Sequence, residues 1–245
     1  MASSPKSKHR AGVARARPRR NKAGSLPPPA AVAFDLDGTL VDTVPARVKA
    51  WLMALREDGI MVTKPQVAKL IGSDGRRVAI ESGRIVGRIV GPDEAESTDR
   101  RQGQLFEALN TAPRPLPGAR EILVGLDKRG IPWAIATSSR PEQAVASLAA
   151  LRLRRPATVV DGGDVANAKP APDLLLKAAR ILGVEPSRCW YVGDSRWDMM
   201  AAVSAGMIGV GVTGGSAVGA PSLQEGGATL VCKSLREVLE RLPGP

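Results

Sequence analysis

The chain has 245 residues, 43% of them apolar and only 3% aromatic, which is enough for a large aliphatic core in one or two domains. Its net charge is +11, but residues 1–30 hold eight basic residues and no acid, so the rest carries +11 less eight, or +3. The single histidine, His9, lies in that basic segment, which excludes a histidine-based triad or a histidine-rich zinc site from the remainder.

Residues 1–30 are predicted to form a disordered basic tail. They are rich in Ser, Pro, Ala and Arg, lack apolar periodicity, and end in a stiff proline run. No apolar segment follows Arg19 and Arg20, which argues against a secretory signal, and an organelle transit peptide stays an alternative. The tail could contact nucleic acid or an anionic surface, but charge runs of this kind are more often solvated extensions.

The composition indicates a cytoplasmic protein. No stretch is long and apolar enough to cross a membrane. The two cysteines, Cys189 and Cys232, show no metal-ligand spacing and are too few for a disulfide framework. The sequence does not indicate an oligomeric state.

From residue 31 onward, short apolar runs alternate with amphipathic helical patterns. This alternation predicts an α/β fold with a doubly wound, Rossmann-like parallel sheet. Strands are predicted at 32–36, 133–137, 158–160, 190–192, 208–212 and 230–231, and helices between them at 119–128, 141–151, 172–182, 197–205 and 234–242.

Residues 44–113 break the alternation, with no convincing strand and helical patterns at 45–58, 64–71, 76–90 and 93–109. We therefore predict a core of residues 31–43 and 114–245 with an inserted helical cap, 44–113. Ligands of open α/β sheets bind at the carboxyl ends of the strands, so this insert would cover the site as a lid. Within the cap, Val78, Ile85 and Ile89 are expected to face its apolar core.

The first predicted strand ends in Asp35 and Asp37, followed by Gly38. Two nearby carboxylates in different environments can divide the roles of nucleophile and proton carrier. Asp and Gly also mark ordinary turns, so this motif alone does not decide between catalysis and a turn.

Later strand ends carry further polar residues. Thr137 and Ser138 offer hydroxyls and amides for phosphate oxygens, Lys169 offers an ammonium group, and Asp194 and Asp198 form a second acidic pair. Each has a simpler explanation as a helix cap, a surface charge or a helix-dipole partner. Their order at successive strand ends instead indicates phosphoryl transfer with Mg²⁺.

With these motifs the chain resembles the haloacid dehalogenase-like hydrolases across about residues 31–242. The insert is placed like the cap of phosphoglycolate phosphatase-like and β-phosphoglucomutase-like members. The resemblance implies that Asp35 attacks phosphorus to form an aspartyl-phosphate, and that Asp37 protonates the leaving oxygen and then activates water. It also implies Mg²⁺ bound by Asp35, the backbone carbonyl of Asp37 and Asp194, with Asp198 nearby. The residues predicted to bind phosphate or substrate are Gly38, Thr137, Ser138, Lys169 and Arg76.

The sequence therefore predicts a Mg²⁺-dependent phosphatase acting on a small phosphorylated metabolite. The metal and Lys169 would offset the repulsion between a carboxylate nucleophile and a phosphate ester. Haloacid dehalogenation is disfavoured, because a leaving halide needs no proton from Asp37. Arg76, in a basic cap loop, is expected to bind an anionic group of the substrate, with a solvated cap edge as the alternative.

Two other functions stay open. One is a sugar phosphomutase, but Arg47 follows Pro45 and Ala46 where mutase-like members usually carry a histidine. The other is a non-catalytic protein that binds nucleic acid or a partner through its basic tail.

Overall fold

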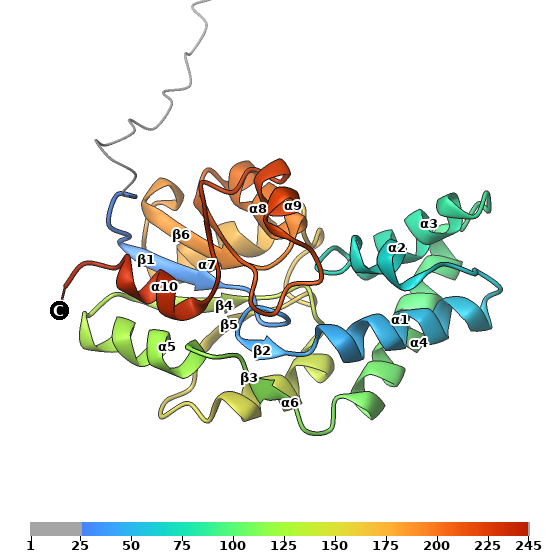
Figure 1. Cartoon of the computed structure of the whole chain (residues 1–245), viewed down its shortest axis with the longest axis horizontal. Helices are drawn as coiled ribbons and strands as arrows, with labels where there is room; N and C mark the ends of the chain where they lie inside the picture. The colour runs from blue at the N-terminus through green and yellow to red at the C-terminus, as the bar shows by residue number, and fades with distance from the viewer. Residues whose placement is uncertain (1–25, 245) are drawn as a thin grey trace, which may run out of the picture.

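The computed structural model describes residues 26–244 (Figure 1). The predictions for residues 1–25, including most of the basic tail and His9, lie outside the described residues. The last residues of the predicted tail contact the core, since Leu26 packs on its apolar cluster and Trp190 Nε1 donates to the carbonyl of Pro27 at 3.0 Å.

The core is a sheet of six strands in the order β5-β4-β1-β6-β7-β8, and every neighbouring pair is parallel. The strands are β1 (Ala31–Phe34), β4 (Trp133–Ala136), β5 (Thr158–Val160), β6 (Cys189–Gly193), β7 (Ile208–Val212) and β8 (Leu230–Cys232). Each corresponds to a predicted strand, with end differences of at most two residues. The predicted α/β class is confirmed.

Helices cover both faces of this sheet, as a doubly wound fold requires. They are α5 (Ala119–Lys128), α6 (Pro141–Leu151), α7 (Asp173–Leu182), α8 (Arg196–Ala205), α9 (Ala220–Glu225) and α10 (Leu235–Glu240), with a 3-10 turn at Pro186–Arg188. Alternate residues of β1 point to opposite faces: Val32 and Phe34 pack with α5, α6 and α10, whereas Ala31 and Ala33 pack with α7 and α8. Small alanines on one face therefore allow α7 and α8 to pack closely on the sheet.

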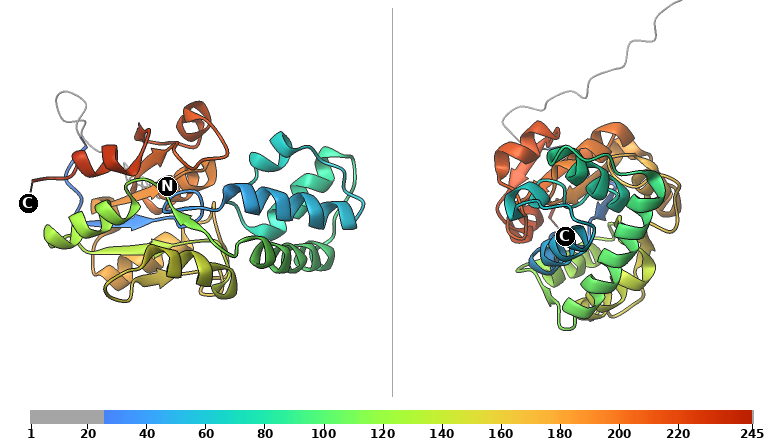
Figure 2. Two further views of the ribbon diagram at one scale, coloured as in Figure 1. Left: turned by 60° about the horizontal axis from the view of Figure 1, so that its bottom comes forward. Right: turned by 90° about the vertical axis from the view of Figure 1, so that its right-hand side faces the viewer.

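Four helices form a separate unit beyond the carboxyl ends of the strands (Figures 1 and 2). They are α1 (Val44–Glu57), α2 (Lys64–Ala68), α3 (Gly75–Ile85) and α4 (Pro92–Leu109). They share an apolar cluster that includes Val48, Trp51 and Val78 and extends to Trp197 of core helix α8. The chain enters and leaves this unit beside two short antiparallel strands, β2 (Val41–Asp42) and β3 (Arg114–Pro115), which the sequence patterns did not predict. The inserted helical cap is confirmed, and its limits at residues 44 and 113 remain our prediction.

One expectation for the cap was wrong. Val78 is buried, but Ile85 is 43% exposed and Ile89 is 94% exposed. The helical pattern predicted to reach residue 90 ends at Ile85, because Gly87 takes a positive φ of 73° and turns the chain. Ile89 therefore lies beyond the helix and outside the cap core.

Two findings concern the helices and the cysteines of the described residues. No helix within residues 26–244 is long and apolar enough to cross a membrane. Cys189 and Cys232 are both buried, and burial raises the pKa of each thiol to about 11, so both stay protonated at neutral pH.

Candidate active site

The loop after β1 separates the two acids of the first motif. The amide of Asp35 still donates to the carbonyl of Val192 at 2.9 Å, as a strand residue does. Gly38 then takes a φ of 87°, and a Cβ there would lie 2.5 Å from Asp194 Oδ2. Only glycine fits both the conformation and the space, and the turn it permits follows directly after the two acids.

Asp35 is buried against a lysine. Lys169 Nζ donates to Asp35 Oδ1 at 2.5 Å, to Asp198 Oδ1 at 2.8 Å and to the Tyr191 hydroxyl at 3.0 Å. Burial by itself lowers the pKa of Lys169, but the charges of Asp198 and Asp35 outweigh it and hold the pKa well above its usual value. Lys169 is therefore a permanent buried cation beside the predicted nucleophile.

Asp35, Asp194 and Asp198 form a buried acidic cluster, in which one oxygen from each lies within 4.8 Å of the others. Burial raises the pKa of Asp35 to about 7, with Asp198 adding to the shift, although Lys169 opposes it. Burial, then repulsion from Asp198 and Asp35, raises the pKa of Asp194 well above its usual value. Three carboxylates with one lysine leave excess negative charge that a divalent cation would relieve, and hard oxygen ligands suit Mg²⁺. The residues therefore fit the predicted ion.

The two acids near Asp35 differ in their remaining capacity to bind a metal. Asp198 Oδ2 accepts from the amide and hydroxyl of Ser195 at 2.9 and 2.6 Å, and its Oδ1 accepts from Lys169 and Tyr191. Asp194 accepts from the Thr39 hydroxyl at 3.2 Å, so most of its acceptor capacity remains. Asp194 is thus the better ligand, and Asp198 is placed to hold Lys169.

Asp37 lies in a separate network. Its oxygens accept from the Thr43 hydroxyl at 2.7 Å, the Ser139 hydroxyl at 2.5 Å and Arg47 Nη2 at 2.6 Å. Its partners differ from those of Asp35, as a division of labour between two acids requires.

Arg47 is a site residue that the sequence reasoning did not assign. It comes from cap helix α1, is 8% exposed, and stacks on the Phe106 ring with 3.7 Å from Cζ to the ring centre. Its Nη1 also donates to Gln143 Oε1 at 3.1 Å. Two sequence signals could have found it: Arg47 follows Thr43 by one helical turn, and it stands where mutase-like proteins usually carry a histidine.

Thr137 and Ser138 follow β4 at the same edge of the sheet. The Thr137 hydroxyl accepts from the Ser139 amide at 3.1 Å. The Ser138 hydroxyl is buried with no partner among the described residues. The free hydroxyl and the turn's amides are the kind of donors that bind phosphate oxygens.

A cavity of about 50 Å³ lies between the strand ends and the cap. It brings together five of the predicted site residues, Asp35, Asp37, Thr137, Ser138 and Lys169. Its cap side is lined by Arg47, Trp51, Ile71, Gly72, Ser73, Gly75, Val78, Asp99 and Gln102.

Arg76 is not among the residues that line this cavity. Its side chain is 48% exposed and pairs with Asp74 at 2.8 Å. Although burial raises the pKa of Asp74, Arg76 holds that pKa below its usual value. Arg76 instead lines two neighbouring hollows on the outer side of the cap loop.

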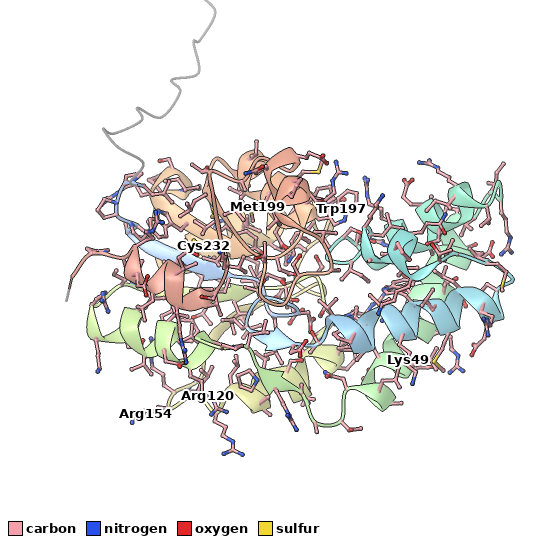
Figure 3. All side chains as sticks on the ribbon, in the orientation of Figure 1. Lys49, Arg120, Arg154, Trp197, Met199 and Cys232 are labelled. Atoms are coloured by element: carbon pink, nitrogen blue, oxygen red, sulfur yellow. The ribbon has the colours of Figure 1, made fainter. Side chains whose placement is uncertain are left out.

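The cap is seated directly on the core. The Asp74 amide donates to the Lys169 carbonyl at 2.9 Å, and Trp197 Nε1 donates to the Lys69 carbonyl at 3.0 Å. Figure 3 labels Trp197 at this junction, on the side of α8 nearest the cap. Gly72 packs against Ser195, where a Cβ would lie 2.4 Å from Oγ. The cavity is therefore covered in this conformation.

A doubly wound sheet with a helical cap over buried acids and a lysine at its strand ends is the arrangement of a capped enzyme with a Rossmann-like core. The model of the haloacid dehalogenase-like hydrolase family matches residues 29–206. The chain belongs to the haloacid dehalogenase-like hydrolase family, which confirms the resemblance found in its motifs.

Two curated relatives and one solved structure show the extent of the similarity. Phosphoglycolate phosphatase of Neisseria meningitidis is 36% identical over 195 residues, covering 76% of this chain and 80% of the relative. Hexitol phosphatase A of Escherichia coli is 34% identical over 207 residues, covering 84% of this chain and 91% of the relative. The crystal structure of a hydrolase from Pseudomonas syringae has a TM-score of 0.81 and 34% identity, covering 87% of this chain and 97% of that one.

Proposed function

We propose that this chain, a phosphatase of the haloacid dehalogenase-like family, hydrolyses the phosphate ester of a small metabolite with Mg²⁺, through an aspartyl-phosphate on Asp35. The observation that carries the proposal is the pair of separate acid networks at one cavity. Asp35 contacts Lys169, whereas Asp37 contacts Arg47, Thr43 and Ser139. A nucleophile and a proton carrier need such different surroundings.

In the first half-reaction, the Asp35 carboxylate attacks phosphorus and the bond from phosphorus to the ester oxygen breaks. Asp37 gives its proton to that oxygen, so the alcohol leaves neutral. Lys169 neutralises charge on the transferring group, and the hydroxyls and amides of Thr137 and Ser138 bind its oxygens.

In the second half-reaction, water attacks the phosphorus of the aspartyl-phosphate. Asp37, now a carboxylate, takes the proton of that water, and inorganic phosphate leaves as Asp35 is regenerated. Covering of the cavity by the cap limits the water that can reach the phosphoenzyme.

Asp35 and Asp194 would hold Mg²⁺, which supplies the positive charge needed for a carboxylate to approach a phosphate ester. The proposed ligands of Mg²⁺ also include the backbone carbonyl of Asp37. Asp198 keeps Lys169 directed at Asp35 through its 2.8 Å ion pair. Gly38 has no Cβ, which would collide with Asp194, so the Asp194 carboxylate can lie against the loop.

The direct test measures phosphate release from a panel of small phosphate esters with Mg²⁺, combined with acid quenching of enzyme mixed with a ³²P-labelled ester. We expect Mg²⁺-dependent release and a labelled protein band, with the label lost in Asp35→Asn. Release of phosphate without any labelled enzyme, under conditions where bond breaking is faster than hydrolysis of the intermediate, would refute the covalent route.

The same panel separates the phosphomutase alternative. If hexose phosphates were converted to isomers without net phosphate release, the aspartyl-phosphate would be passing to a second hydroxyl of the sugar. Arg47, which pairs with Asp37 where mutase-like proteins usually carry a histidine, favours hydrolysis.

The names of the relatives leave the substrate open between two kinds of leaving group. A phosphoglycolate phosphatase releases an alcohol that carries a carboxylate, whereas a hexitol phosphatase releases one that carries only hydroxyls. The two differ by a full negative charge at the end of the substrate that faces the cap.

A further inference from the structure

We propose that the cavity selects a short phosphate ester whose leaving group carries hydroxyls and no charge, a polyol phosphate of three or four carbons, and that Gln102 binds one of those hydroxyls. This substrate class deepens the phosphatase activity proposed above and rests on it.

The first observation is that the buried side-chain amide nitrogen of Gln102 has no partner among the described residues. Gln102 lies on α4, is 1% exposed and lines the cavity. Within residues 26–244, its Nε2 has no hydrogen-bond partner. A buried donor without a partner is costly, so such a group at a binding cavity points to a ligand that completes it.

The chemistry of the amide matches a hydroxyl. A side-chain amide carries both a donor and an acceptor, and a hydroxyl can satisfy either one. A carboxylate only accepts, and it needs compensating positive charge when it is buried. Gln102 supplies no charge.

The second observation is that both cations at the cavity are already paired. Among the described residues that line it, Lys169 pairs with Asp35 and Asp198 at 2.5 and 2.8 Å, and Arg47 pairs with Asp37 at 2.6 Å. Arg47 also donates to Gln143 and Ser139 at 3.1 and 2.8 Å, contacts that do not depend on the charge of Asp37. Lys169 is also the proposed partner of the phosphoryl group, so it is not free to bind a carboxylate on the leaving group.

The cap side instead presents an acid. Asp99 lines the cavity from α4, three residues before Gln102, and pairs with Arg140 at 2.8 Å. Arg140 itself is absent from the cavity lining. A carboxylate on the leaving group would thus approach Asp99 without an uncommitted cation, whereas a hydroxyl can donate to it.

The third observation is size. Between the strand ends and the cap the cavity is half-open and offers about 50 Å³, which holds roughly three to five water-sized groups, since one water needs about 10–15 Å³. Because the phosphoryl group must share this space with the leaving group, we expect short leaving groups to fit it better than hexitols. Trp51, Ile71 and Val78 offer apolar contact for their carbon chain.

The test compares two esters that differ only at the end of the leaving group. sn-Glycerol 3-phosphate and L-3-phosphoglycerate share their carbon chain and their configuration at C2, and a hydroxymethyl group in one replaces the carboxylate of the other. We expect kcat/KM to be at least about tenfold higher for the glycerol ester, because the carboxylate loses its hydration without gaining a cation. Equal or higher kcat/KM for L-3-phosphoglycerate would overturn the proposal.

A reporter ester keeps this proposal distinct from the phosphatase activity itself. If p-nitrophenyl phosphate is hydrolysed but no polyol phosphate of three or four carbons is, the proposed substrate class is wrong and the proposed phosphatase activity stands. If no ester, including the reporter, is hydrolysed with Mg²⁺, both proposals fail.

Gln102→Met tests the residue, with Gln104→Met as the matched control because Gln104 is exposed on the same helix. We expect Gln102→Met to lower the ratio of kcat/KM for glycerol 3-phosphate to that for p-nitrophenyl phosphate about five- to tenfold, the effect of one hydrogen bond. Gln104→Met should leave the ratio unchanged. If the ratio does not change in Gln102→Met, Gln102 has only a structural role and its proposed contact is wrong. If Gln102→Met does not fold, the same ratio is measured in Gln102→Glu, whose side chain is of equal size.

Discussion

The core and cap sides of the cavity hold their polar groups in different ways. On the core side, Asp35, Lys169 and Asp198 are buried and satisfy one another through direct ion pairs. On the cap side, Gln102 has a buried amide nitrogen without a partner in the described part of the chain. Because the Ser138 hydroxyl on the core side also lacks a partner among the described residues, both sides keep donors for a substrate. The difference teaches that the ion pairs that hold the nucleophile come from the core alone.

Arg47 is where the two sides meet. It belongs to cap helix α1 yet donates to Asp37 and Ser139 of the core at 2.6 and 2.8 Å. The cap therefore contributes a charged contact to the proposed proton carrier as well as a wall to the cavity.

The largest effect should come from the core side. Asp35→Asn keeps the size of the side chain and removes the nucleophile, so we expect kcat to fall about 10⁴-fold or more. Phosphate release with the best ester measures this, and circular dichroism checks the fold. Asp42→Asn, at an exposed strand position, is the control and should keep full activity. A variant at Asp35 with activity near wild type would end the proposed mechanism.

Metal removal should have the next largest effect, again on the core side. A chelator should abolish phosphate release, and Mg²⁺ at about 100 times its Kd should add about 2.7 kcal/mol to the free energy of unfolding. Thermal unfolding with and without Mg²⁺ measures this gain.

Asp194→Asn tests whether the proposed metal site lies at Asp194. It removes a proposed ligand and also relieves the burial of a charge and the repulsion that together raise the pKa of Asp194. Without Mg²⁺ this variant should be at least as stable as wild type, and it should gain little when Mg²⁺ is added. Equal gains in the two proteins would place the metal elsewhere.

Arg47→Met tests the contact between the two sides. Asp37 loses its charged partner but keeps Thr43 and Ser139, so we expect kcat to fall about tenfold to a hundredfold, part of the effect of a general acid–base group. Steady-state kinetics measure the change. Arg56→Met, at an exposed position of α1, is the control. Full activity with Met at position 47 would show that the cap makes no contribution to proton transfer.

The smallest effect should come from the outer edge of the cap. Arg76 is half-exposed and pairs with Asp74, and pairs of this kind contribute about 0–1 kcal/mol. We expect Arg76→Ala to change KM by less than about threefold. A rise in KM of about tenfold or more would instead support the substrate contact that the sequence predicted for Arg76.

The strand-end residues could be predicted because their signals are local. Asp35, Thr137 and Asp194 each follow a short apolar run, and parallel strands bring their carboxyl ends to one edge of the sheet. The two-residue strands β2 and β3 and the short helix α9 were missed, because elements of that length carry too little periodicity to recognise.

The cap was predicted less well in detail. Ile89 has an apolar side chain that suits a continued helix, but the helix ends at Ile85. Lys169 was predicted from its place before a helix, but its burial between two acids was not, because those acids lie 134 and 29 residues away in the chain.

The sequence by itself determined the α/β class, the inserted cap and the acids and lysine at the strand ends, since these follow from periodicity and short motifs. Only the tertiary structure decided that Arg47 contacts Ser139, 92 residues away, and that Gln102 lines the cavity with an amide nitrogen that has no partner in residues 26–244. The physical reason is that the pairing of a buried polar group depends on which distant segments pack around it, and no local pattern records that.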